Sequence, residues 1–163
     1  MTRVREAILT HQGGLRFTAT TGTKRVIVMG DKVETGSLSP VETLVVCLAA
    51  CSAMDVVGIA EKKRQQVTTY RVHVKATQRD EYPQILTWIE VTHEFQGPRL
   101  EEAALRRAIE LSALKYCPVN AMLSAGAAEV HHRYRIIATA PGQVDDDGEV
   151  VVTGPYRRPE IVD

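Results

Sequence analysis

The alternation of apolar and polar residues predicts six strands along the chain. Three short runs come first, EAILTH, LRFTATT and RVIVMG, and the turn-forming residues QGG and GTK separate them. Two longer runs, TYRVHVKATQ and QILTWIEVTHEF, alternate with the same period of two and are joined by the turn EYP. A last strand is predicted at EVHHRYRIIA.

The most apolar segment, SPVETLVVCLAACSAMDVV, begins a long helix that is predicted from Ser39 to about Arg64. Ser39 suits the N-cap, Pro40 the first helical position, and Glu42 completes a capping box. Apolar residues lie almost all round this helix, and one sheet can cover only one of its sides. We therefore expect a second copy of the chain to cover the rest, in a symmetric homodimer.

Two further helices are predicted between the later strands. The run LEEAALRRAIELSALKY has Leu105, Ile109 and Ala113 on one face, and Cys117 before a proline ends it. A short helix, PVNAMLSAGA, follows. This order of elements predicts an α+β domain with antiparallel sheets packed around the long helix. We expect one domain over residues 1–140 and an extension over residues 141–163, either a tail or a small hairpin at GEVVV.

The charge balance narrows the possible partners and location. Basic and acidic residues number 20 each among 163, so the formal net charge is zero and no strong basic field would attract nucleic acid. The longest charge-free run of the helix, residues 43–54, is shorter than the roughly 20 residues of a membrane span. The charged N-terminus is unlike a signal peptide. We expect a cytoplasmic protein without nucleic-acid or membrane partners.

The candidate chemistry lies in three cysteines, too few for a secreted disulfide scaffold. Cys47, Cys51 and Asp55 share one stripe of the long helix, where both cysteines could simply be small core residues. Cys117 falls at or beside the N-cap of the short helix, where free amides and the helix dipole favour a thiolate. On charge alone Cys117 is the more reactive thiol, because Asp55 disfavours a second anion near Cys51. A purely capping or packing role for Cys117 stays open.

Other polar residues are expected to have structural roles. Asp55 could pair with Lys62 or Lys63. His131 and His132 point to opposite faces of a strand, so they cannot chelate one metal together, and both are expected to be exposed.

The motifs SP-x-E-x-L and AAC-SAMDVV, followed by a second cysteine in LKYCPVNAML, resemble the OsmC/Ohr family of osmotically inducible and organic hydroperoxide resistance proteins. The resemblance covers about residues 3–138. It implies an intertwined homodimer that acts as a thiol peroxidase without a cofactor. Cys51 would attack an organic hydroperoxide and become a sulfenic acid, Cys117 would condense with it to a disulfide, and a lipoyl-type dithiol would reduce the disulfide.

The resemblance also implies an arginine from the N-terminal strands, held by a glutamate near the start of the long helix. Arg16 is the best positional match for the arginine, and Arg25 is second. Glu42 matches the glutamate of a less characterised branch, since familiar peroxidases place it one residue earlier, where this chain has Val41.

Two alternatives to the peroxidase remain. One is a non-catalytic protein that binds a small molecule, or senses redox state, in an apolar pocket at the dimer interface. The other is a metal site formed by Cys51, Cys117 and a histidine, but the sequence lacks metal-ligand spacing, so no metal is predicted.

Overall fold

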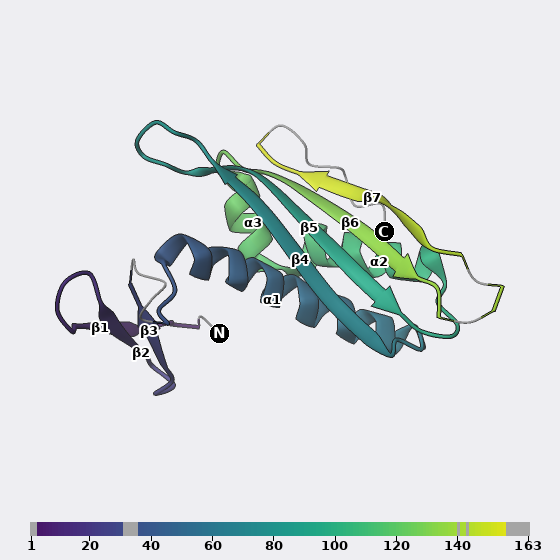
Figure 1. Ribbon diagram of the computed structural model, residues 1–163, viewed down its shortest axis with the longest axis horizontal. Helices are drawn as coiled ribbons and strands as arrows, with labels where there is room; N and C mark the ends of the chain where they lie inside the picture. Colours follow the sequence, from purple (N-terminus) through teal and green to yellow (C-terminus); the bar gives the residue numbers. More distant parts are fainter. Residues whose placement is uncertain (1–2, 31–35, 140, 143, 156–163) are drawn as a thin grey trace. The chain divides into compact units, whose positions relative to one another are not determined.

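The computed structural model of the protein describes residues 3–30, 36–139, 141–142 and 144–155. The chain divides into two compact units, Met1–Val45 and Val46–Asp163, and each contains one sheet (Figure 1). The boundary falls inside the long helix α1 (Pro40–Lys62). Two sheets and one long helix confirm the predicted α+β class.

The first unit contains a three-stranded antiparallel sheet in the order β1 (Ala7–His11), β2 (Phe17–Thr21) and β3 (Val26–Met29). All three strands were predicted from the alternating runs. Gly13 and Gly14 form the turn between β1 and β2 with φ values of 104° and 55°, a region that glycine enters without steric cost.

Helix α1 begins at the predicted capping box. The Ser39 N–H donates to Glu42 Oε2 at 2.8 Å, and the Glu42 N–H donates to Ser39 Oγ at 3.2 Å. These reciprocal bonds satisfy two amides that no helical carbonyl can reach. Past the end of α1, Arg64 has a φ of 58°.

Helix α1 differs from the expectation drawn from its charge-free run. Among the described residues, α1 alone is long and apolar enough to cross a membrane by length and composition. The sequence predicted a segment too short to span a membrane because only the twelve residues without charge were counted. The whole helix has 23 residues and few charges. The central helix of a soluble protein meets the same criteria.

The second unit is built on a four-stranded sheet in the order β4 (Thr69–Gln78), β5 (Leu86–Gln96), β6 (Glu129–Ile137) and β7 (Asp146–Thr153). The prediction of antiparallel pairing holds for β4–β5 and β6–β7 but is wrong for β5–β6, which are parallel. The reason is the helical connection between them. It returns the chain to the starting end of β5, where Trp88 pairs with Glu129, so the connection is a crossover and not a hairpin.

Strand β7 is the only secondary-structure element described after residue 140. It pairs antiparallel with β6 and so completes one edge of the sheet. The segment GEVVV, where a small hairpin was one of the two expectations, lies instead within this single strand of eight residues. The division into residues 1–140 and 141–163 stays a prediction.

The crossover consists of α2 (Glu102–Leu111), η2 (Ser112–Tyr116) and α3 (Pro118–Ala125). Where one continuous helix was predicted, the chain widens at Ser112 into a π-helical turn, and the Cys117 N–H donates to the Ser112 carbonyl at 2.9 Å. Such wide turns are frequent at functional sites.

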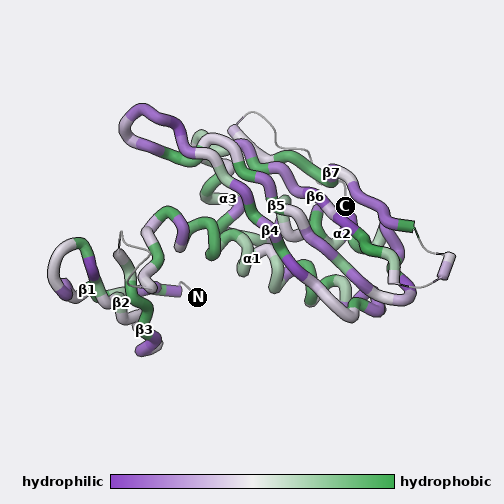
Figure 2. The backbone as a smooth tube through the Cα atoms, viewed as in Figure 1, coloured by the Kyte–Doolittle hydropathy of each residue, from purple (hydrophilic) through white to green (hydrophobic). Residues whose placement is uncertain are grey.

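The core of the second unit lies between the sheet and the helices, which cover one of its faces (Figure 1). It joins Val56 of α1 to Phe95, Leu105, Ile109 and Tyr134, each at most 4% exposed. The face of α2 that the sequence predicted is therefore buried. Figure 2 shows apolar residues along most of α1, whereas polar and apolar residues alternate along β4.

Candidate active site

The fold brings Cys51 and Cys117 together. Cys51 lies midway along α1, and Cys117 lies at the junction of η2 and α3. The two sulfur atoms and one carboxylate oxygen of Asp55 all lie within 4.8 Å of one another. These cysteines are 66 positions apart in sequence, yet their sulfurs lie close enough in the fold for a disulfide to form after a small movement.

The structure places Cys117 at the N-cap of α3, as predicted, where its sulfur accepts the Asn120 N–H at 3.3 Å. Burial, however, raises the pKa of Cys117 to about 12, and the hydrogen bond with Cys51 acts in the same direction. The amides of Asn120 and Val119 lower it by less. The expectation that Cys117 is the more reactive thiol is therefore wrong, because its side chain is only 3% exposed and burial outweighs the helix N-terminus.

The other two cysteines differ in exposure. Cys51 is half-buried, whereas Cys47, one turn earlier on α1, is exposed. Within one chain, a core role, which the sequence left open for both, is not observed for Cys47. Of the thiol pair, Cys51 is the member that solvent reaches more easily.

Asp55 does not pair with Lys62 or Lys63 in the part of the chain that is described. It accepts a hydrogen bond from Ser112 Oγ at 3.0 Å instead. Ser112 Oγ lies 3.3 Å from Ser52 Oγ, which lies 3.2 Å from Nε2 of His93. A buried row of polar side chains therefore leads away from the thiol pair.

The row ends at Tyr70, whose hydroxyl lies 2.6 Å from Nδ1 of His93. Burial lowers the pKa of His93 to about 3, with a smaller contribution from His132, so this ring is neutral near pH 7. Burial raises the pKa of Tyr70 and keeps its hydroxyl protonated. Sequence reasoning missed this row. A signal was present, because His93 occupies an inward position of β5 between Val91 and Phe95, where an apolar residue is the rule.

His132 corrects another expectation. It lies on the opposite face of β6 from His131, as predicted, but it is fully buried and not exposed. Its Nε2 lies 3.0 Å from Oδ1 of Asn120, whose Nδ2 donates to the Ala113 carbonyl at 2.7 Å. Asn120 thereby connects β6 to the wide turn, and its backbone N–H donates to the sulfur of the N-cap residue Cys117.

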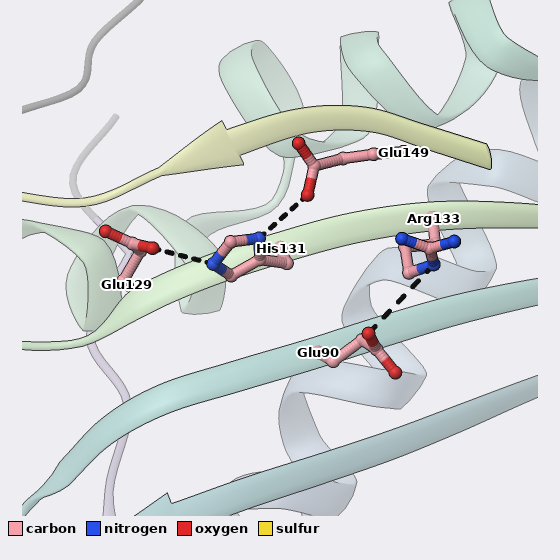
Figure 3. A network of polar contacts seen from close by, with 5 residues as sticks. All are labelled: Glu90, Glu129, His131, Arg133 and Glu149. Atoms are coloured by element: carbon pink, nitrogen blue, oxygen red, sulfur yellow. Dashed lines mark hydrogen bonds and ion pairs between the residues drawn. The ribbon is translucent and has the colours of Figure 1, made fainter.

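His131, on the outer face of the sheet, lies in a different environment (Figure 3). Its Nε2 lies 2.7 Å from Glu129 and its Nδ1 lies 2.8 Å from Glu149. Partial burial alone would lower the pKa of His131, but the hydrogen bonds to Glu149 and Glu129 outweigh burial and raise it. Beside it, Arg133 lies 4.0 Å from Glu90.

Arg16 and Glu42, the other two predicted site residues, belong to the first unit, and their roles stay predictions. Arg16 is exposed, and its backbone closes the turn between β1 and β2 through a 3.1 Å bond from its N–H to the Gly13 carbonyl. Its alternative, Arg25, is exposed just before β3. Hydrogen bonds from the backbone and side chain of Ser39 lower the pKa of Glu42.

Cys51, Asp55 and Cys117 are also the described group of side chains that could surround a metal ion. The third member is a carboxylate and not the histidine that the sequence alternative required. Both ring nitrogens of the nearby His93 are already hydrogen-bonded. The arrangement fits a thiol pair with a neighbouring carboxylate better than a metal centre.

Comparison with known proteins identifies the family of this chain. A family model described as OsmC-like protein matches residues 31–133. The chain belongs to the OsmC-like family. Protein YhfA of Escherichia coli (strain K12) is 35% identical over 125 residues, which are 77% of this chain and 92% of YhfA.

Solved structures extend the likeness of this OsmC-like protein. A hypothetical protein from Aquifex aeolicus VF5 is 31% identical, covers 84% of this chain and 100% of its own, and has a TM-score of 0.73. The organic hydroperoxide resistance protein OhrB of Bacillus subtilis is 18% identical, covers 79% and 97%, and has a TM-score of 0.52, which shows a shared fold. The resemblance drawn from the cysteine motifs is confirmed at the level of the family.

Proposed function

We propose that this OsmC-like protein is a thiol-dependent peroxidase that reduces organic hydroperoxides in oxidative-stress defence. The observation that carries the proposal is the approach of the two sulfur atoms of Cys51 and Cys117 to within 4.8 Å. A sulfenic acid formed on one sulfur would have the other thiol beside it, which favours a disulfide over further oxidation. The name of OhrB, a structure of the same fold, points to the same chemistry.

The environments of the two thiols support the roles that the family resemblance implies. Cys51, the more exposed thiol, attacks the terminal peroxide oxygen, so an S–O bond forms, the O–O bond breaks and an alcohol leaves. Cys117, buried and protonated, then attacks the sulfur of the sulfenic acid, so a disulfide forms and water leaves. A lipoyl-type dithiol reduces the disulfide and completes the cycle.

Arg16 and Glu42 complete the proposal as the pair that favours the thiolate of Cys51. A guanidinium near a thiol lowers the thiol pKa, and a carboxylate partner would hold that guanidinium in place. We expect Arg16→Gln and Glu42→Gln each to lower turnover on the order of tenfold, and the double variant to be no worse than the worse single one. If Arg25→Gln lowers turnover and Arg16→Gln does not, Arg25 takes the role.

A homodimer is part of the proposal because α1 keeps apolar side chains uncovered within the described residues of one chain. Val46 is 52% exposed and Met54 is 71% exposed. A second copy of the chain would remove this surface from water. We propose a cytoplasmic dimer without nucleic-acid or membrane partners. Light scattering at low micromolar concentration should find twice the mass of one chain, and a folded monomer would contradict the proposal.

The experiment that tests the activity is a steady-state assay with dihydrolipoamide as reductant. Cumene hydroperoxide and t-butyl hydroperoxide should be consumed in many equivalents per protein, and hydrogen peroxide more slowly. Cys51→Ser should abolish turnover. Consumption of one equivalent or none by the wild-type protein would contradict the proposed peroxidase.

A second candidate is a non-catalytic protein that binds a small molecule or senses redox state. The observation that favours it is a pocket of about 180 Å³ in the second unit, whose lining includes the apolar or aromatic side chains of Val57, Val67, Tyr70 and Phe95 and the polar side chains of Glu61, Gln65 and Thr68. Such a protein would bind an apolar molecule without turnover, and the same assay separates the two candidates.

A further inference from the structure

The hydrogen-bond row beside the thiols has a single consistent direction. Ser112 Oγ donates its one proton to Asp55, so it must accept from Ser52. Ser52 has then used its own proton and must accept from Nε2 of His93. In the neutral ring, Nδ1 is left as an acceptor for the hydroxyl of Tyr70.

Four donors in series therefore point toward one carboxylate. Ser52, His93 and Ser112 are all fully buried. Buried polar groups of this kind are retained only where each is satisfied, and a fully satisfied network fixes its members in place. The row holds the carboxylate of Asp55 beside the two sulfurs. Without these hydrogen bonds, the side chain of an aspartate would be free to turn toward water.

The thiol chemistry needs a group that can take up and return a proton at this place. Cys117 must lose a proton as its sulfur attacks, yet its pKa is about 12 and its side chain is only 3% exposed. The oxygen that leaves the sulfenic acid must gain a proton to depart as water. Bulk water has little access to Cys117, whereas a carboxylate oxygen of Asp55 lies within 4.8 Å of both sulfurs.

We propose that Asp55 is a third catalytic residue, which carries a proton from the attacking thiol to the departing oxygen; this inference rests on the proposed function. In the first step Asp55 takes the proton that leaves Cys51 when the thiolate forms, and gives this proton to the alkoxide as the O–O bond breaks and the alcohol leaves. In the second step the Cys117 proton passes through Asp55 to the hydroxide as the S–S bond forms and the S–O bond breaks. Both steps balance without an external proton.

Ser112, Ser52, His93 and Tyr70 are then positioning residues that act through Asp55. Ser112 touches the carboxylate directly, and the others orient Ser112. Removing Ser112 frees the carboxylate, whereas removing Tyr70 leaves the bond between Ser112 and Asp55 in place. The effect on the reaction should therefore decrease along the row, away from the thiols.

The test isolates the attack by Cys117 in a Cys47→Ser background, which removes the exposed thiol. Treatment with dithiobis(nitrobenzoate) places one aromatic thiol on Cys51 and releases the other half of the reagent, which gives a first rise in visible absorbance. Attack by Cys117 then releases the aromatic thiol from Cys51, and this second rise is the rate that is followed. As in the attack on the sulfenic acid, Cys117 must lose its proton in this attack, but no hydroperoxide is required. Asp55→Asn, which keeps an acceptor for Ser112, should slow the release about 100-fold, the usual range for general acid–base catalysis. Asp55→Glu should recover part of the rate.

The same variants are then treated with one equivalent of cumene hydroperoxide. In Asp55→Asn the sulfenic acid on Cys51 should form more slowly than in wild type and then persist long enough to be trapped by dimedone, because Asp55 serves both steps. If the wild-type protein does not react with hydroperoxide but Asp55→Asn still slows the aromatic thiol release, the proposed function fails and Asp55 keeps only the role of base for the Cys117 thiol. Equal release rates in wild type and Asp55→Asn would overturn the role of Asp55, whatever the peroxide assay shows.

The positioning role of Ser112 is tested by comparing release rates with and without the Asp55 carboxylate. A loss of stability alone would not produce a difference between these two backgrounds. Ser112→Ala should slow the release about tenfold when Asp55 is present and have no effect when Asp55 is Asn, because Ser112 acts through the carboxylate. Ser112→Thr keeps the hydroxyl and should recover the rate. An equal effect of Ser112→Ala in both backgrounds would overturn the positioning role, as would a Thr variant that folds normally and remains slow.

Discussion

The two faces of the four-stranded sheet use the same residue type in opposite ways. On the inner face, burial lowers the pKa of His132 to about 4, with a smaller contribution from His131, and the neutral ring bonds to Asn120. On the outer face, the next residue along the same strand, His131, lies between two glutamates that raise its pKa. One step along a strand reverses the side of the sheet, and with it the charge state that the fold favours.

Polar residues on the two faces of the sheet have different roles. Inward polar residues form buried hydrogen bonds with one another beside the candidate active site, such as those of Ser52 with His93 and Ser112. Outward residues form ion pairs that solvent partly screens, such as Arg133 with Glu90 (Figure 3). Changes on the inner face should therefore have larger effects on stability than matched changes on the outer face.

The largest expected difference is between the two adjacent histidines. His132→Ala removes a fully buried ring and its bond to Asn120 and should lower the free energy of unfolding by about 2–4 kcal/mol. His131→Ala should lower it by less than about 1 kcal/mol, because its glutamate partners are exposed and ion pairs that solvent partly screens contribute little. Urea unfolding of both variants at pH 7 checks the comparison, and equal losses would contradict it.

Acidification should act through the inner face. The folded-state pKa values of His93 and His132 lie below the value of about 6.5 expected in the unfolded chain, so the unfolded state binds more protons between them. Stability from these residues is present above pH 6.5 and is lost as the pH falls toward 4. His132→Gln should lose less stability than wild type between pH 7 and 5, whereas His131→Gln should not reduce this acid-side loss.

A smaller effect is expected for one hydroxyl at the end of the inner row. Tyr70→Phe leaves Nδ1 of the buried His93 without its donor and should lower the free energy of unfolding by about 1–2 kcal/mol. Tyr82→Phe is the matched control, because Tyr82 is 88% exposed and its hydroxyl keeps water as a partner. A Tyr70 variant as stable as the Tyr82 variant would show that the row is not closely coupled.

The smallest effect is the pH dependence of the outer face, which has the opposite sign. The folded-state pKa of His131 is raised, so its stabilisation is fully present below pH 6.5 and is lost as the pH rises through the folded value. From pH 6 to 8.5 the wild-type protein should lose slightly more stability than His131→Gln does. A larger loss in the variant would contradict the ion-pair account.

Most elements could be predicted from the sequence, because their signals are local. Alternation identified the strands, and the capping box fixed the start of α1. The parallel pairing of β5 and β6 could not be predicted from short-range patterns, since it depends on where the crossover returns the chain. The wide turn at Ser112 was also missed, because SALKY continues the periodicity of a helix and its altered hydrogen bonding is a tertiary effect.

The candidate active site was predicted in part. The family resemblance, and not the periodicity, named Cys51 and Cys117, and the fold brings them together. Local reasoning favoured Cys117 as the reactive thiol because the sequence shows the helix N-terminus but not the burial that outweighs it. The partner of Asp55 was missed for a similar reason, since Ser112 lies 57 positions away and only the crossover brings it near.

The most direct test of the central claim is to identify the disulfide that forms in the reduced protein after one equivalent of cumene hydroperoxide. Peptide mapping without reductant should find one intramolecular bridge, between Cys51 and Cys117, with Cys47 free. Cys117→Ser should instead leave a sulfenic acid on Cys51 that over-oxidises readily. A bridge that includes Cys47, a bridge between two chains, or three unmodified thiols would contradict the account.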